Sequence, residues 1–111
     1  MSLTNKDCVK TKADTPKLPD SDIKKLLKET PSWAISHDTE IPHLARDFSF
    51  SDYLSALKFI NKVGIESDKL DHHPKITLEW GLVRIEWWTH SIGGLHTNDF
   101  IMAYLCDRMY G

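Results

Sequence analysis

The most regular alternation of apolar and polar side chains lies in the second half of the chain. Apolar residues hold every even position from Lys75 to Trp80 and every odd position from Val83 to Trp87. Because successive side chains of a strand point to opposite faces, each run predicts a strand with one buried face. Gly81 separates the two runs and permits a tight turn. The pattern therefore predicts an antiparallel hairpin with Trp80 and Trp87 on its core side.

Apolar residues recur at the spacing of an α-helix in three other parts of the chain. We expect helices over residues 20–30, 52–66 and 98–110. Side chains that can accept a hydrogen bond from free backbone N–H groups stand at the start of each helix: Asp20 or Ser21, Ser51 followed by Asp52, and Thr97. Pro31 ends the first helix, because the residue before a proline avoids the helical region.

Two weaker apolar runs, over residues 33–35 and 41–50, predict two further strands. The register of the second is weakly specified, because Arg46 and Phe48 fall on the same parity. The resulting order is helix, two strands, helix, two strands, helix. We therefore predict an α+β two-layer sandwich (α-β-β-α-β-β-α), in which three helices cover one face of a four-stranded antiparallel sheet.

The composition changes near Leu18. Residues 1–17 are mostly polar, so burial cannot offset the entropy of ordering them, and we expect a flexible N-terminal tail. Residues 18–111 are long enough to bury one core and contain no internal repeat or linker. They predict a single domain.

Charge and hydropathy narrow the possible partners and the location. Hydrophobic residues make up 41% of the chain, charged residues 27%, and the net charge is -2, which predicts no nucleic-acid or anionic-membrane partner. No apolar run approaches the roughly 20 residues of a membrane span, and the N-terminus lacks the apolar segment of a signal peptide. Cys8 and Cys106 have neither disulfide nor metal-type spacing, so we expect reduced thiols in a cytoplasmic protein.

A cluster of histidines and carboxylates carries the candidate chemistry. His72 and His73 are adjacent and close to Asp68 and Asp71, and His90 closes the second strand of the hairpin. Imidazole, with an ordinary pKa of about 6.5, can both give and accept a proton near neutral pH. Three imidazoles could therefore divide the acid and base steps of one reaction.

Two other interpretations of the cluster stay open. In a regular strand leading into Pro74, the rings of His72 and His73 would face opposite ways, so they share a cleft only if the backbone bends there. Without that bend they are a pair of surface histidines. The second interpretation is a metal site, for which the available ligands are His72, His73, His90, His96, Asp71 and Asp99. No helical His-x-x-x-His pattern, cysteine ligand or recognised two-histidine-one-carboxylate spacing supports it, and we predict no metal.

Four further residues allow a structural or a functional interpretation. Trp33 and Trp88 either belong to the core or stack on a planar ligand. Asp99 is either a first-turn acid of the last helix or the carboxylate that orients a histidine. Cys106 is most simply a small core residue of that helix.

Together these residues form one extended sequence motif: an acid, a His-His-Pro triplet, an aromatic residue, a histidine and an aspartate. The positions are Asp68, His72, His73, Pro74, Trp80, His90 and Asp99. This spacing resembles that of the pterin-4a-carbinolamine dehydratase family. The similarity continues upstream through Trp33, Phe48-Ser49-Phe50, Ala56, Phe59 and Val63, and so covers the chain from about Leu18 to its C-terminus. Where many members have Ala-Glu before the motif, this chain has Glu66-Ser67-Asp68.

The resemblance implies a lyase that dehydrates a 4a-hydroxytetrahydropterin to the quinonoid dihydropterin, with no metal or organic cofactor. The implied catalytic residues are His72, His73, His90 and Asp99. The implied substrate-binding residues are Trp33, Asp68, Asp71, Trp88 and Thr89. The family commonly forms homodimers or homotetramers. Some animal relatives also act as dimerisation cofactors of a homeodomain transcription factor, and some catalytically degenerate relatives assist enzyme assembly. A non-catalytic partner protein is therefore the alternative function.

Overall fold

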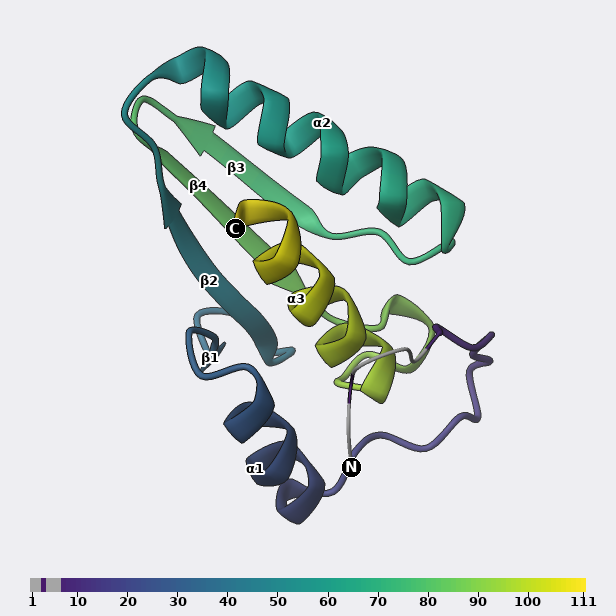
Figure 1. The fold of residues 1–111 in the computed structure, drawn as a ribbon. Coiled ribbons are helices and arrows are strands. Elements are labelled where there is room, and N and C mark those ends of the chain that lie inside the picture. Colours follow the sequence, from purple (N-terminus) through teal and green to yellow (C-terminus); the bar gives the residue numbers. More distant parts are fainter. Residues whose placement is uncertain (1–2, 4–6) are drawn as a thin grey trace.

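The computed structural model describes residue 3 and residues 7–111 of the 111-residue chain. Figure 1 shows helices and strands in the order that the hydrophobic pattern predicts. Their bounds are α1 (Asp20–Glu29), β1 (Ala34–Ser36), β2 (His43–Ser49), α2 (Tyr53–Lys69), β3 (Lys75–Glu79), β4 (Leu82–Trp87) and α3 (Thr97–Tyr110). A short 3-10 helix, His90–Ile92, follows β4. The predicted α+β class, with a four-stranded antiparallel sheet, is confirmed.

The sheet has the strand order β1-β2-β4-β3, with every neighbouring pair antiparallel. The predicted hairpin is β3 and β4, in which Ile76 faces Ile85 and Leu78 faces Val83. Gly81 makes the turn with a φ of 78°, a left-handed conformation that glycine adopts without steric cost. Because Lys75 at the start of β3 pairs with Glu86 near the end of β4, the C-terminal end of the hairpin, followed by His90, lies close to the end of α2.

The ambiguous register of β2 has a physical explanation. Arg46 does lie on the same face as the buried Phe48, and its guanidinium carbon stands 4.2 Å from the centre of the Phe48 ring. Its charge is paired with the carboxylate of Asp107 on α3. The arginine therefore covers the aromatic core with its planar group and keeps an acidic partner, so the polar residue costs the core little.

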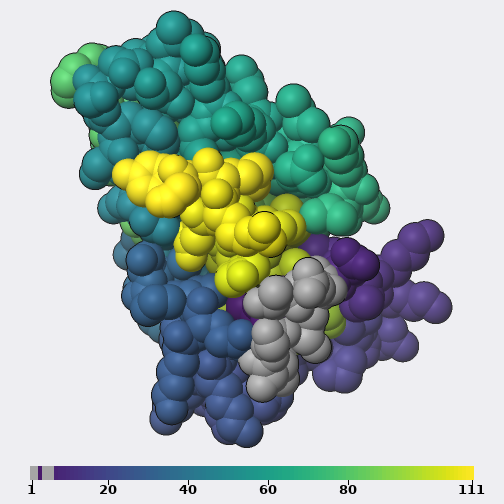
Figure 2. Space-filling view, viewed as in Figure 1, coloured from purple at the N-terminus to yellow at the C-terminus, as the bar shows by residue number. Residues whose placement is uncertain are grey.

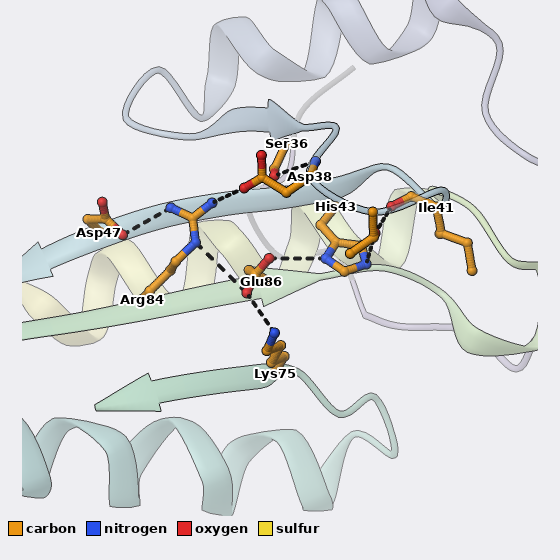
Figure 3. A network of polar contacts seen from close by, with 9 residues as sticks. Ser36, Asp38, Ile41, His43, Asp47, Lys75, Arg84 and Glu86 are labelled. Carbon is orange, nitrogen blue, oxygen red and sulfur yellow. Dashed lines mark hydrogen bonds and ion pairs between the residues drawn. The ribbon is translucent and has the colours of Figure 1, made fainter. Parts of the chain in front are cut away.

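Helices α2 and α3 lie across one face of the sheet, and α1 packs beside α3 near β1 (Figure 1). The core between the layers contains Phe48, Ile85, Trp87 and Phe100, all of them 0% exposed. The opposite face of the sheet, with α3 behind it, carries a network of polar side chains (Figure 3). Its members are Ser36, Asp38, His43, Asp47, Lys75, Arg84 and Glu86.

One predicted core residue lies outside the core. Trp80 is 75% exposed, whereas Trp87 is fully buried as expected. Strand β3 ends at Glu79, so Trp80 belongs to the turn between β3 and β4 rather than to the paired part of the sheet. Period-two alternation identifies the face on which a side chain lies but not whether a helix covers that position.

The N-terminal segment lies against the body of the molecule beside the start of α3 (Figure 2). Residues 1, 2 and 4–6 of the predicted flexible tail lie outside the described residues, and the motion of residues 1–17 stays a prediction. The described part is irregular but anchored: Leu3 is buried and its backbone N–H donates to the Glu29 carboxylate at 2.9 Å. None of the helices in the described ranges is long and apolar enough to cross a bilayer.

Candidate active site

A sharp turn after α2 brings the two adjacent histidines to the same cavity. The helix ends at Lys69, and Asp71 follows with a φ of 52°, a left-handed conformation that aspartate tolerates better than most residues. The backbone N–H of His72 then donates to the Ser67 carbonyl at 3.1 Å. This is the bend that a shared cleft requires, and it lets His72 and His73 border one cavity instead of opposite faces of a strand.

The cavity has a volume of about 310 Å³, near the lower end of the range of about 300–1,000 Å³ for small-molecule pockets. Its walls come from three distant parts of the chain. The lining residues are Thr11, Asp71, His72, His73, Thr89, His90 and Ser91. Three imidazoles, drawn from the end of α2 and from the 3-10 helix after β4, therefore share one hollow with a carboxylate and hydroxyls.

His72 is held by a buried carboxylate. Its Nε2 lies 2.6 Å from Oδ1 of Asp99, and the side chains of the two residues are 9% and 0% exposed. The ring also lies parallel to the buried indole of Trp87, with 5.6 Å between ring centres and 7° between planes. The imidazole is therefore fixed in orientation by one charged hydrogen bond and one aromatic face.

Asp99 makes both kinds of contact that its sequence position allows. As a first-turn residue of α3, its Oδ2 accepts from the backbone N–H of His96 at 2.9 Å, which completes a capping box. The same oxygen accepts from the Thr89 hydroxyl at 2.9 Å, and Oδ1 meets His72. A helix start thus supplies the fixed donors that hold the carboxylate toward His72.

The N-cap of α3 is His96 rather than the predicted Thr97. Nδ1 of His96 accepts from the backbone N–H of Asn98 at 3.0 Å, so this nitrogen must be unprotonated. Burial lowers the pKa of His96 below its ordinary value, and the His72 ring adds to that effect, while the negative charge of Asp99 opposes it. An imidazole acts here as a cap, a use that a search for Ser, Thr, Asp and Asn misses.

His73 and His90 stand at the open side of the cavity. The His73 side chain is 55% exposed and meets Asp68, itself 86% exposed, at 3.2 Å between Nε2 and Oδ1. His90 is exposed and begins the 3-10 helix. Asp68 touches the site only through His73 and does not line the cavity.

The structure places the two candidate stacking tryptophans away from the cavity lining. Trp33 is buried, and its indole N–H donates to Asp107 at 2.8 Å. Trp88 has one face covered by His43, with ring centres 3.8 Å apart and planes 8° apart, and it meets His90 at 4.5 Å. Trp88 is half-buried and contacts His90, and stacking of its indole on a planar ligand stays a prediction.

Three residues near the site carry no signal in the sequence analysis. Thr11 and Ser91 line the cavity, and their hydroxyl oxygens are 2.7 Å apart across its edge. Asn98 is 3% exposed and binds the backbone of Val9 with its side chain. Single polar residues in irregular or first-turn positions are common, so only the folded chain shows that these three meet beside the histidines.

A larger cavity, of about 550 Å³, lies elsewhere, between α2 and α3. It is lined by Lys62, Ile65, Glu66, Leu105, Arg108 and Met109, none of which is an imidazole. The candidate active site is therefore assigned by its chemistry rather than by its size. Within residue 3 and residues 7–111, no group of three His, Cys, Asp or Glu side chains is arranged to hold a metal ion.

Comparison with known proteins identifies the family. The family model for pterin 4 alpha carbinolamine dehydratase matches residues 16–109. A protein of Saccharophagus degradans, named provisionally as a pterin-4-alpha-carbinolamine dehydratase, is 42% identical over 108 residues, which is 97% of this chain and 96% of the relative. A protein of Marinobacter nauticus with the same provisional name is 41% identical over 98% of both chains.

Solved structures share the fold. The chain superposes with a TM-score of 0.79 on a transcriptional coactivator/pterin dehydratase of Brucella melitensis, at 27% identity over 86% of this chain and 100% of that one. A pterin dehydratase-like protein identified as a RuBisCO assembly factor in the alpha-carboxysome gives a TM-score of 0.61 at 22% identity, over 72% of this chain and 90% of the other. The chain belongs to the pterin-4-alpha-carbinolamine dehydratase family.

Proposed function

We propose that the protein is a hydro-lyase that converts a 4a-hydroxytetrahydropterin into the quinonoid dihydropterin and water, as part of tetrahydropterin recycling in the cytoplasm. The observation that carries the proposal is the meeting of three imidazoles around one cavity, with His72 backed by a buried carboxylate. Membership of the family supports the substrate class.

The reaction needs one proton delivered and one removed. A proton goes to the 4a-hydroxyl oxygen, and the bond between C4a and that oxygen breaks as water leaves. The lone pair of N5 forms the new C4a–N5 double bond, and the N5 proton is taken by a base. Each positioned acid or base contributes about 10²–10⁴-fold. The elimination needs only these two proton transfers and no oxidant or reductant, so the proposal includes no metal or organic cofactor.

His72 and His90 are the proposed pair of proton-transfer groups. Nε2 of His72 is bound to Asp99, which leaves Nδ1 as the nitrogen that exchanges a proton with the substrate. Thr89 and the His96 amide hold Asp99 in place for this task. His90 approaches from the other wall and takes the opposite role.

The more exposed polar groups are proposed to bind the pterin. His73, with Asp68 behind it, and the carboxylate of Asp71 border the open side of the cavity. They offer donors and acceptors to the polar pyrimidine ring of a pterin. This division leaves proton transfer to His72 and His90 and recognition to His73 and Asp71.

The test is the decay of a freshly generated 4a-hydroxytetrahydropterin, followed by its absorbance in a stopped-flow instrument. Wild-type protein should accelerate the decay over buffer, and His72→Ala should abolish the acceleration while its circular dichroism stays native. His37→Ala, at an exposed histidine outside the cavity, is the matched control and should keep full activity. Undiminished turnover by His72→Ala would refute the proposed roles.

A role as a partner protein is the second candidate, because the related Brucella melitensis structure is described both as a transcriptional coactivator and as a pterin dehydratase. A pull-down from source-cell extract that recovers no other protein would count against this role.

We also propose a homodimer or homotetramer. Helix α2 supports this with exposed apolar side chains at Leu54, Leu57 and Ile65, beside the large cavity between α2 and α3. Light scattering on wild-type and Leu57→Glu protein tests the assembly, since the charged variant should dissociate if this face is the contact.

A further inference from the structure

Residues 8–11, which we call the N-terminal strap, line a cavity next to the histidine cavity, and Thr11 lines both. They lie before the part of the chain that the family model matches, which begins at residue 16. The alignment with the Saccharophagus degradans relative nevertheless spans 97% of the chain and therefore the strap. A segment with no helix or strand of its own is held beside the proposed catalytic groups.

A side-chain amide clamps the strap in place. Oδ1 of Asn98 accepts from the backbone N–H of Val9 at 3.0 Å, and Nδ2 of Asn98 donates to the Val9 carbonyl at 2.7 Å. These two bonds satisfy both backbone groups of one residue, as a neighbouring β-strand would. Asn98 is 3% exposed and directly precedes Asp99, so the clamp and the catalytic carboxylate are fixed to the same turn of α3.

The far end of the strap meets the other wall of the cavity. The hydroxyl of Thr11 is 2.7 Å from that of Ser91, the residue after His90. Thr11 lines the 310 Å³ histidine cavity and also a neighbouring cavity of about 420 Å³. Asp71 and His72 line both cavities as well. The strap therefore stands between two hollows that meet at the buried catalytic histidine.

We propose that the N-terminal strap is a wall of the pterin site and that Thr11 is a substrate-binding residue. The inference rests on the proposed function in one respect: the ligand is a pterin. The Asn98 clamp fixes the strap before the ligand arrives, so the Thr11 hydroxyl is already placed to exchange its bond with Ser91 for one with the polar edge of the bicycle. The strap contributes to binding and not to proton transfer, so releasing it should raise KM and Kd and leave kcat nearly unchanged.

Val9→Pro tests the clamp without touching the catalytic residues. Proline removes the N–H that Asn98 accepts from, whereas Val9→Ala keeps both bonds and is the matched control; the Val9 side chain is 60% exposed. The probe is 7,8-dihydrobiopterin, a stable dihydropterin, titrated by calorimetry. Val9→Pro should weaken binding by several-fold to about tenfold, the range expected for one lost hydrogen bond, while Val9→Ala binds as wild type. Equal affinities of the two variants would overturn the proposal.

A second variant isolates the hydroxyl. Thr11→Val keeps the shape of the side chain and loses its hydroxyl, and Thr11→Ser keeps the hydroxyl. We expect weaker dihydropterin binding for Thr11→Val and near-normal binding for Thr11→Ser. If both variants bind as wild type, Thr11 is not a binding residue.

Limited proteolysis gives a readout that general destabilisation would not reproduce. Lys10 and Lys12 are exposed, so trypsin can cleave within the strap after Lys10 and just beyond it after Lys12. Saturating 7,8-dihydrobiopterin should slow this cleavage in wild-type and Val9→Ala protein and should not slow it in Val9→Pro. Cleavage at an unchanged rate in liganded wild type contradicts a wall that contacts the ligand.

Failure of the strap and failure of the proposed function are distinguishable, because binding and turnover are measured separately. A chain that dehydrates the carbinolamine but binds pterin equally well in Val9→Pro and Val9→Ala keeps the function and loses the strap. A chain that binds pterin through the strap but does not accelerate dehydration keeps the strap and loses the function.

Discussion

Two histidine–carboxylate pairs are buried in the described part of the chain, and only one of them borders the cavity to which we assign proton transfer. His72 meets Asp99 at 2.6 Å, and His43 meets Glu86 at 3.1 Å. All four side chains are at most 9% exposed. The pairs are thus alike in residue type and burial, and a search for buried imidazoles next to carboxylates would find both.

The surroundings of the two rings differ. Both nitrogens of His43 are engaged, Nδ1 with Glu86 and Nε2 with the Thr39 hydroxyl at 3.3 Å, and its face is covered by Trp88. His72 has one nitrogen on Asp99 and borders a cavity that two further imidazoles share. A buried pair becomes chemically useful where one nitrogen faces space that a substrate can enter.

The carboxylates differ as well. Glu86 lies 3.8 Å from the charged nitrogens of both Lys75 and Arg84, so its negative charge is shared among cations of the sheet face. Besides His72, Asp99 is bound by two neutral donors, the Thr89 hydroxyl and the His96 amide. The charge of Asp99 is therefore available to stabilise the protonated form of the His72 imidazole, whether His72 acts as the acid or as the base.

Replacing each carboxylate by its amide should separate the pairs most strongly. We expect Asp99→Asn to lower kcat by about 10²-fold or more, because an amide neither favours the required tautomer nor balances an imidazolium. Glu86→Gln should keep kcat within about threefold and act mainly on stability. Stopped-flow decay of the carbinolamine measures kcat, and thermal melts of both variants provide the control. Similar losses of activity in the two variants would remove the distinction drawn here.

The second expected difference concerns the N-terminal strap, which borders the His72 region and not the His43 region. Cys8, the first residue of the strap, reports whether the strap is in place. Burial, with smaller contributions from Asp99 and Asp7, raises the pKa of the Cys8 thiol to about 11 from 9.0. Releasing the strap in Val9→Pro should return the pKa toward its ordinary value and speed alkylation by iodoacetamide at pH 8. The increase should approach about a hundredfold, as the thiolate fraction rises.

Cys106 serves as the internal reference for that measurement. It is 0% exposed, and burial raises the pKa of its thiol to about 12, so its peptide should stay unmodified in both proteins. Peptide mass spectrometry resolves the two cysteines. Equal alkylation of Cys8 in Val9→Ala and Val9→Pro would show that the Asn98 clamp does not shield the thiol.

Trp88 contacts one histidine from each region, since His43 lies on one of its faces and His90, which lines the cavity, also touches it. If the indole positions His90, Trp88→Ala should lower kcat by about two- to tenfold, the range for an aromatic contact, with KM nearly unchanged. Trp88→Phe should recover most of the activity, and Trp80→Ala, at the exposed turn, is the neutral control. A rise in KM at constant kcat would instead support the sequence-based expectation that Trp88 stacks on the pterin.

The smallest expected effect concerns the cap that holds Asp99. The pKa of His96 is lowered in the folded protein, so unfolded chains bind more protons at this position as pH falls below its ordinary 6.5. The stabilising effect of the neutral cap is present above that pH and is lost as pH falls through the lowered pKa. His96→Asn retains a cap that does not titrate. Between pH 7 and 5, its Tm should fall by a few degrees less than that of wild type, and identical shifts would contradict a titrating cap.

The sequence predicts the elements well where one physical rule decides. Alternation in residues 75–87 identifies the hairpin, because the side chains of each strand point either to the helices or to the polar face. The start of α2 is predicted to within one residue: the N-cap is Asp52, whose carboxylate accepts from the Ser55 N–H at 2.7 Å, rather than the expected hydroxyl of Ser51. The prediction that Trp80 is buried is wrong, because alternation does not show whether another element covers the end of a hairpin.

The site is harder to predict because it depends on backbone angles and on contacts over long sequence distances. The spacing identifies His72, His73 and His90 as candidates, but their convergence requires the left-handed φ of Asp71, which no periodicity reveals. The position of Thr11 depends on a clamp at Asn98, 87 residues further along the chain, so a polar composition alone suggests only a tail.

One measurement tests the central claim most directly: the decay rate of 4a-hydroxytetrahydropterin with two histidines replaced from each region. With wild-type protein the decay should be far faster than in buffer, and His72→Gln/His90→Gln should return it to the buffer rate, since each group contributes about 10²–10⁴-fold. The matched double variant His37→Gln/His43→Gln should keep at least about a tenth of the wild-type rate, because neither ring borders the cavity. Wild-type protein that leaves the decay unchanged, or a cavity variant as fast as its matched control, would contradict the account.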